Sequence, residues 1–200
     1  PVVAIVGDSK VSSKLGVLEN LANRVDSLIV GGGIANTFLV AANKDVGKSL
    51  YEKQLVDRAR AIMDKVEVIL PSDVVVSTEI SDKSVALKKL VDDIGPDEMI
   101  LDIGISSSER VSKILEASGT IIWNGPVGVF EIEQFSEGTK SVSAAVSESG
   151  AFSIAGGGDT LAAIEKYKIS ENISYISTGG GAFLKFLENG RLPAIDILIQ

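Results

Sequence analysis

The chain reads Ser27-Leu28-Ile29-Val30-Gly31-Gly32-Gly33 where a short apolar run ends in three glycines. Three later stretches repeat this change: Ile122-Trp123-Asn124-Gly125-Pro126-Val127-Gly128, Ile154-Ala155-Gly156-Gly157-Gly158-Asp159-Thr160 and Ile176-Ser177-Thr178-Gly179-Gly180-Gly181. One such triplet is equally well explained by a tight turn between a strand and a helix. Ligands of open α/β sheets, however, bind outside the carboxyl ends of the strands, where glycine lets backbone N–H groups approach an anion. Because the pattern recurs, we expect these ends to form one edge that binds a polyphosphate.

Short, β-branched apolar runs alternate with helical patterns along the whole chain. The runs are continuous, which is typical of parallel strands covered on both faces. We expect strands at Val2–Val6, Ser27–Val30, Val66–Leu70, Met99–Ile103, Thr120–Trp123, Phe152–Ala155 and Ser174–Ile176. Helical spacing is found in residues 15–25, 55–66, 111–115 and 184–187. The sequence therefore predicts one α/β domain over residues 1–200, built as a three-layer, doubly wound, mainly parallel, Rossmann-like sheet.

Composition excludes several classes of function. The 200 residues are 45% hydrophobic, include no cysteine and no histidine, and carry a formal net charge of −8. A disulfide framework, a thiolate or imidazole catalyst and a Cys/His zinc site are therefore excluded. The acidity argues against binding nucleic acid or an anionic membrane, and no apolar stretch reaches the roughly 18–20 residues of a membrane span. Since no basic region precedes the first apolar run, we do not expect this run to be a secretory signal, and the expected location is the cytoplasm.

Two lysines follow the first strand, in Gly7-Asp8-Ser9-Lys10-Val11-Ser12-Ser13-Lys14. Lys10 and Lys14 are four residues apart, so they share one helix face if the helix has already begun. Two ammonium groups at the carboxyl end of a strand suit a di- or triphosphate, and the alternative is two exposed lysines at a helix start. Because a helix N-terminus disfavours cations, we favour the phosphate-binding interpretation.

Aspartates are the candidate metal ligands of this chain. Asp159 stands with Thr160 at an expected helix N-terminus, where by itself it is most simply an N-cap. The alternative is that Asp159 holds Mg²⁺ while Thr160 and the glycine amides bind phosphate. Asp73 and Asp102 are assigned either to structural caps or to the support of a site.

The Asn-Gly-Pro turn after the strand at Thr120–Trp123 supplies a further set of candidates. Asn124 and Glu131 are placed to hydrogen-bond a nucleotide, with Glu131 suited to ribose hydroxyls. Pro126 and Val129 offer apolar surface to a base or sugar. The alternative is a simple Gly-Pro turn with a solvated Glu131.

In this order the motifs resemble the C-terminal, nucleotide-binding half of phosphoglycerate kinase of the bacterial type, from Val2 to about Pro193. The resemblance is carried by Ser9-Lys10-Val11 with Lys14, Val30–Phe38, Gly47–Leu50, Leu70–Asp73, Trp123–Glu131, Gly156–Thr160 and Ser177–Ala182. It implies a glycolytic kinase that transfers a phosphoryl group between 1,3-bisphosphoglycerate and Mg-ADP. It also implies a separate N-terminal domain, which binds phosphoglycerate and supplies an arginine. Because an arginine in this role contributes about 10³–10⁵ in rate, we expect these 200 residues to bind nucleotide with little or no turnover.

The resemblance also implies roles for individual residues. The catalytic set is Lys10, Gly157 and Gly180. The set that binds ADP or ATP is Lys14, Gly31, Gly32, Gly33, Asn124, Pro126, Val129, Glu131, Gly157, Gly158, Asp159 and Thr160. Within it the Gly31–Gly33 loop lies near the adenine, Glu131 serves the ribose and Asp159 serves the Mg²⁺.

Three positions depart from the family pattern. Asp8 stands where members often have glycine, Tyr175 where many have histidine, and Ile105 where many have proline. Two other functions are also considered. A non-catalytic interaction fragment would expose an apolar patch. A dinucleotide-dependent oxidoreductase would need a Gly-x-Gly-x-x-Gly after the first strand, which this chain lacks.

Overall fold

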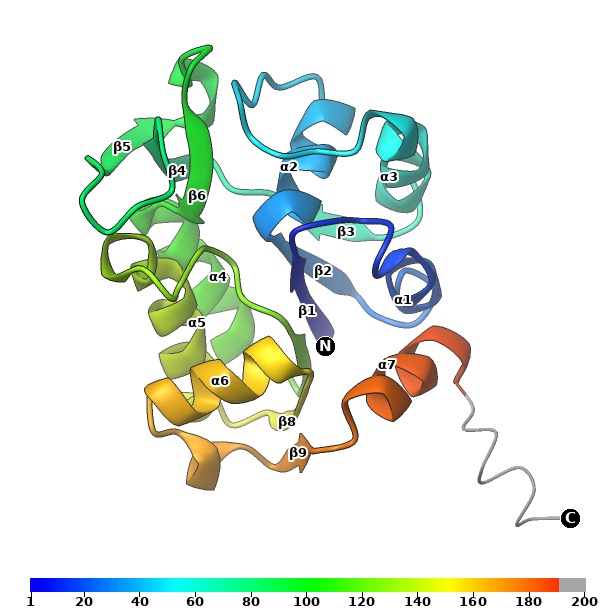
Figure 1. Ribbon diagram of the computed structural model, residues 1–200. Helices are drawn as coiled ribbons and strands as arrows, with labels where there is room; N and C mark the ends of the chain where they lie inside the picture. The colour runs from blue at the N-terminus through cyan, green and yellow to red at the C-terminus, as the bar shows by residue number, and fades with distance from the viewer. Residues whose placement is uncertain (191–200) are drawn as a thin grey trace, which may run out of the picture.

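The computed structural model describes residues 1–190 (Figure 1). Residues 191–200 of the expected domain, including Pro193 at the end of the resemblance, lie outside the described residues. The main sheet is six-stranded and parallel throughout, in the order β3-β2-β1-β7-β8-β9. Its strands are β1 (Val2–Asp8), β2 (Ser27–Gly31), β3 (Glu67–Ile69), β7 (Thr120–Asn124), β8 (Phe152–Gly156) and β9 (Tyr175–Ser177).

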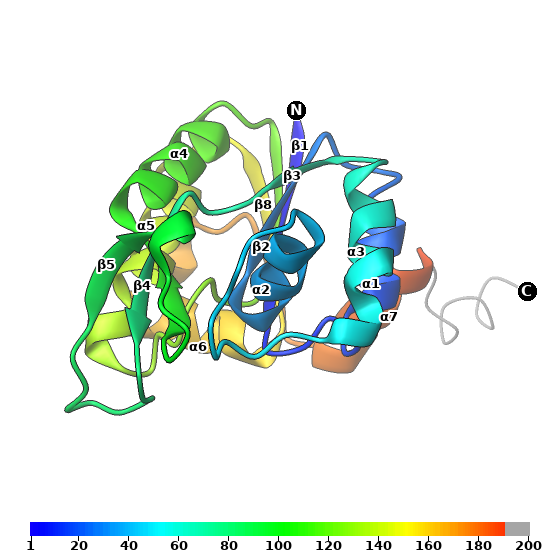
Figure 2. The same cartoon turned by 90° about the horizontal axis from the view of Figure 1, so that it is seen from above.

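Helices cover both faces of this sheet, which confirms the doubly wound α/β fold (Figures 1 and 2). One face carries α4 (Ile105–Glu116), α5 (Glu137–Glu148) and α6 (Gly158–Lys166). The other face carries α1 (Leu15–Leu21), α2 (Gly32–Ala41), α3 (Val56–Met63) and α7 (Gly180–Asn189). Along β1, Val3 and Ile5 pack toward the first group, whereas Ala4 and Val6 pack toward the second. This two-sided burial explains why the strand sequence is continuously apolar.

A second sheet, antiparallel and three-stranded, packs beside α2 and α4 and in the order β5-β4-β6. It consists of β4 (Asp73–Ser77), β5 (Leu87–Leu90) and β6 (Met99–Ile103). The expectation of a parallel strand at Met99–Ile103 is therefore wrong, because a buried apolar run specifies a strand but not the direction of its partner. The strands β4 and β5 and the helix α5 are additions to the predicted elements.

The carboxylate of Asp73 fixes the start of α4. It accepts hydrogen bonds from Ser106 N at 3.0 Å, Ser107 N at 2.7 Å and Ser107 Oγ at 2.6 Å. Burial opposes ionisation of this carboxyl, but the hydrogen bonds from Ser107 and Ser106 outweigh it and lower the pKa of Asp73. The structural-cap interpretation of Asp73 is thus confirmed.

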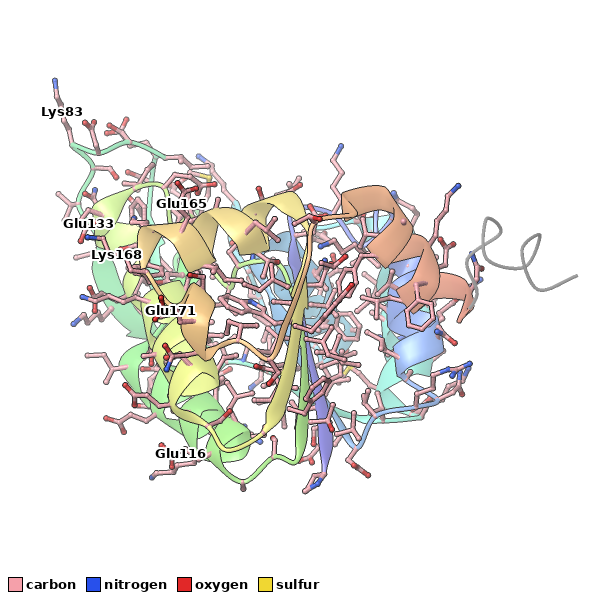
Figure 3. All side chains as sticks on the ribbon, turned by 90° about the horizontal axis from the view of Figure 1, so that it is seen from below. Lys83, Glu116, Glu133, Glu165, Lys168 and Glu171 are labelled. Carbon is pink, nitrogen blue, oxygen red and sulfur yellow. The ribbon has the colours of Figure 1, made fainter. Side chains whose placement is uncertain are left out.

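Apart from buried groups such as Lys14 and Asp102, charged side chains lie on the outside of the layers. Figure 3 shows Glu165, Lys168 and Glu171 on the outer side of α6 and the turn that follows it, and Lys83 at the tip of the loop before β5. Within residues 1–190, no helix combines the length and the apolar character needed to cross a membrane.

Candidate functional site

The carboxyl ends of the six parallel strands lie at one edge of the main sheet, and the strand order reverses there between β1 and β7. The register places Val6 beside Asn124 and Gly7 beside Gly31. At such a reversal the connecting helices leave in opposite directions and open a crevice, which is the usual ligand position in this class of fold. The candidate site is built on this crevice.

Lys14 is the buried cation of the crevice, with a side chain that is only 10% exposed. Its Nζ donates hydrogen bonds to the Gly7 carbonyl at 3.0 Å and to Asn124 Oδ1 at 2.5 Å. Burial lowers the pKa of the ammonium group, while the neighbouring charges of Asp8 and Asp159 act to raise it. A positive charge is therefore held at the sheet edge by backbone and amide oxygens.

The two candidate lysines both lie in the turn between β1 and α1, but they differ in exposure. The helix begins only at Leu15, with Lys14 in its N-cap position, and Ser12 N anchors the turn by donating to Glu52 Oε2 at 2.7 Å. Lys10 is exposed, whereas Lys14 is buried. The expectation that both lysines project from one helix face is wrong, because the helix starts after both. The alternative of exposed lysines fits Lys10 alone.

Asp8, one of the departures from the family pattern, lies beside the buried ammonium. Its carboxylate accepts from Ser9 N at 2.6 Å and from Ser13 Oγ at 3.0 Å. Its Oδ2 lies 3.8 Å from Lys14 Nζ. Asp8 therefore places a negative charge beside Lys14. A glycine at this position would supply no such counter-charge.

A cavity of about 180 Å³ lies against Lys14 and the N-terminus of α6. Gly157 precedes this helix with a φ of 101°, and a Cβ there would come within 2.6 Å of Asn124 Nδ2. Both the left-handed backbone and the close approach require glycine. Gly158, the first residue of α6, has open space beside it. The helix N-terminus and the lysine together make this cavity suitable for phosphate groups.

Two fully buried side chains join the loops around this cavity. Asn124 Nδ2 donates to the Gly156 carbonyl at 2.6 Å, while Oδ1 of the same side chain accepts from Lys14. Thr160 Oγ1 accepts from Gly125 N at 2.7 Å. These amide and hydroxyl groups therefore set the positions of the cavity walls and of the lysine.

Asp159 is the second residue of α6 and is exposed at the cavity wall. The N-cap interpretation is wrong, because β8 runs on to Gly156 and the capping position falls on Gly157. Within the described chain no three acidic, histidine or cysteine side chains gather to hold a metal. Mg²⁺, however, is commonly held by one or two carboxylates together with phosphate oxygens and waters. Asp159, with Asp8 across the same cavity, fits a Mg²⁺ that arrives with phosphate.

A larger cavity of about 330 Å³ adjoins the first and shares Asp8 and Asp159 with it. Of the predicted binding residues, its lining includes Gly32, Gly33, Pro126, Val129 and Glu131. The remaining lining residues are Ser9, Asn36, Leu50, Ile80, Met99, Ile100, Leu101 and Gly128. A mostly apolar cavity with a few polar groups is typical of a site for a base and sugar.

Three predicted residues line neither of these two cavities: Lys10, Gly31 and Gly180. A Cβ on Gly31 would lie 2.5 Å from Val127 Cα, so this glycine serves the close packing of two turns. Gly180 begins α7 beyond β9, with open space beside it.

Sequence reasoning did not find Asn36 and the β6 residues Met99, Ile100 and Leu101 of the larger cavity. Asn36 had a signal, because it lies four residues after Gly32 and is therefore on the same face of α2, among mostly apolar residues. The β6 residues had none, since their place in the cavity depends on the second sheet.

Comparison with known proteins places the chain in a family. The family model described as phosphoglycerate kinase matches residues 1–190. Phosphoglycerate kinase from Coxiella burnetii is 51% identical with a TM-score of 0.97, covering 100% of this chain and 53% of that one. Phosphoglycerate kinase from Pyrococcus horikoshii OT3 is 34% identical with a TM-score of 0.87, covering 100% and 52%. The chain spans about half the length of both structures. This chain belongs to the phosphoglycerate kinase family.

Proposed function

We propose that this chain is the C-terminal, nucleotide-binding half of a phosphoglycerate kinase and that it binds ADP or ATP with Mg²⁺. One observation carries the proposal: a cavity suited to phosphate and a cavity suited to a nucleoside share Asp8 and Asp159 at the reversal point of the sheet. In this arrangement the buried Lys14 ammonium and the N-terminus of α6 attract the phosphates. Asp159 would hold a Mg²⁺ that arrives with them, and Glu131 would bind the ribose.

The activity of the whole enzyme needs more than these residues supply. Phosphoryl transfer depends on neutralising the charge that spreads over the transferred group, and an arginine there contributes about 10³–10⁵ in rate. No arginine within residues 1–190 lines either cavity. We therefore propose that a phosphoglycerate-binding domain is the partner, and that these residues alone bind nucleotide without appreciable turnover. A coupled kinase assay that finds ordinary turnover by the 200-residue chain would contradict this.

Calorimetric titration with ADP, in Mg²⁺ and then in EDTA, tests nucleotide binding. Saturable binding that weakens in EDTA is the expected result. Asp159→Asn should weaken Mg-ADP by roughly tenfold, because a metal ligand is lost. The same change should leave metal-free ADP unchanged or slightly tighter, because a negative charge near the phosphates is lost.

Glu165→Gln is the matched control for this titration. Glu165 lies on the same helix and is exposed, but it lines neither cavity (Figure 3). An equal loss of affinity in both variants, or no ADP binding by the folded protein at millimolar concentration, would overturn the proposal.

A non-catalytic interaction role is a second candidate, because two aromatic side chains at the C-terminal end are exposed. Tyr175 on β9 is 57% exposed and Phe186 on α7 is 49% exposed. Sizing chromatography tests this role, which predicts a dimer that Tyr175→Ser or Phe186→Ser disrupts. No observation favours a dinucleotide-dependent oxidoreductase.

A further inference from the structure

Asn36 is a buried polar residue in the wall of the larger cavity. It lies in α2 among apolar neighbours, and only 3% of the residue is exposed. Its Nδ2 donates to the Leu50 carbonyl at 3.0 Å. Because a carbonyl only accepts hydrogen bonds, this contact fixes which end of the amide is nitrogen and which is oxygen.

The other end of this amide has no partner within residues 1–190. Oδ1 of Asn36 is shielded from water and accepts no hydrogen bond from any described residue. A buried acceptor left unpaired is costly and rare in folded proteins, so each case needs an explanation. Since this one belongs to a residue that lines a cavity, a donor on a bound ligand is the explanation that the geometry offers.

The position of Asn36 in the cavity indicates which part of a nucleotide it meets. The phosphate end is marked by Asp8 and Asp159, because these residues also line the cavity beside Lys14. Asn36 and its neighbour Leu50 line only the larger cavity. A nucleotide with its phosphates at Lys14 therefore brings its base, the part farthest from the phosphates, to this end.

We infer that Asn36 Oδ1 accepts a hydrogen bond from the exocyclic 6-amino group of adenine and so selects adenine over 6-oxopurines. This inference rests on the proposed nucleotide site. A 6-oxo group would bring a second acceptor against Oδ1 and leave both unpaired, which is an unfavourable contact. Because Oδ1 is shielded, this contact requires part of the wall to move as the base enters, and the half-exposed Leu50 beside Asn36 is the residue placed to do so.

Three purine nucleoside diphosphates with different groups at position 6 test the inference by calorimetry on the 200-residue chain, and in the third of them, IDP, N1 also carries a hydrogen. They are ADP, purine riboside 5′-diphosphate, which has hydrogen at this position, and IDP, which has a 6-oxo group. ADP should bind roughly three- to tenfold more tightly than the purine riboside compound, as expected for one net hydrogen bond, and IDP should bind most weakly. Equal affinities for ADP and the purine riboside compound would overturn the inference while leaving the proposed function intact. Binding of none of the three would overturn both.

Asn36→Leu removes the acceptor while keeping the number and branching of the side-chain heavy atoms, and it should bring the ADP to purine riboside ratio close to one. Thr37→Val is the matched control. Thr37 is the next residue of α2, is fully buried, and hydrogen-bonds Gly33 O and Glu52 N without lining the cavity. Its variant should keep the wild-type ratio. The inference is overturned if the ADP to purine riboside ratio persists in Asn36→Leu or falls equally in Thr37→Val. If Asn36→Leu does not fold, the comparison of the three ligands on the wild-type chain decides between the outcomes.

Discussion

Replacing Lys14 with methionine separates the structural role of the buried ammonium from its role toward phosphate. Methionine keeps much of the aliphatic length of lysine but has no donor and no charge. The change removes the hydrogen bonds to the Gly7 carbonyl and to Asn124 Oδ1. It also removes the cation from the wall of the smaller cavity.

The cost in stability follows from these contacts. Each buried acceptor that loses its donor costs about 1–3 kcal/mol. Part of this cost is offset, because burial disfavours the charged form of Lys14 and its removal relieves that penalty. We expect a net loss of about 2–3 kcal/mol, which lowers Tm by roughly 4–12 °C in a domain of this size. Loss of the cation should also weaken ADP binding by at least about tenfold.

Calorimetric unfolding and ADP titration measure both effects, with Lys10→Met as the control. Lys10 is exposed and lines neither cavity, so its replacement should change stability by less than about 0.5 kcal/mol and leave ADP affinity nearly unchanged. The reasoning is refuted if Lys14→Met keeps the wild-type Tm and ADP affinity, or if Lys10→Met shows the larger loss of affinity.

Three further predictions follow from single residues. Asp8→Asn should tighten the binding of metal-free ADP, titrated in EDTA, by roughly three- to tenfold in calorimetry, because a negative charge beside Lys14 is removed; weaker binding would show that Asp8 assists the ligand. Gly157→Ala should lower the free energy of unfolding by about 1–3 kcal/mol in urea titrations, because its φ is 101° and a Cβ would clash with Asn124. Gly158 has open space beside it, so Gly158→Ala should lower the free energy of unfolding by less than about 1 kcal/mol. Equal losses in the two variants would contradict this reasoning. Burial raises the pKa of Asp102 to about 7, so the folded state binds the extra proton and stability should fall by up to about 4 kcal/mol as pH rises from about 4 to 7. Urea titrations across this range should show that Asp102→Asn removes that part of the pH dependence, and an unchanged slope would place the titration elsewhere.

Much of the fold follows from local patterns in the sequence. The runs at β1, β2, β7 and β8 are buried on both faces, so their apolar residues are continuous and identify them as strands without knowledge of their partners. The glycines at their ends are equally local signals. Since all carboxyl ends of a parallel sheet meet at one edge, the sequence was enough to predict the edge of the sheet at which the cavities lie.

The sequence did not predict which strands form the second sheet, or that these strands pair antiparallel. Met99–Ile103 has the same apolar character as the parallel strands, yet it pairs antiparallel with β4. Only this pairing brings Leu101 to the larger cavity, where its carbonyl also accepts from Val129 N at 2.8 Å. The residues of a strand indicate whether it is buried, but its partner strand depends on which distant segments of the chain pack beside it.

The sequence by itself determined the class of fold, the glycine-ended edge and the kinds of side chain available there. The tertiary structure alone decided what each side chain does. Lys14 is buried because Asn124, 110 residues away, supplies its acceptor, and Asp159 is free of a capping role because β8 extends to Gly156. Asn36 Oδ1 becomes a buried acceptor with no partner among the described residues only when the chain has folded around it. The physical reason is common to all three: burial and hydrogen-bond partners come from segments distant in sequence, and a local pattern carries no information about them.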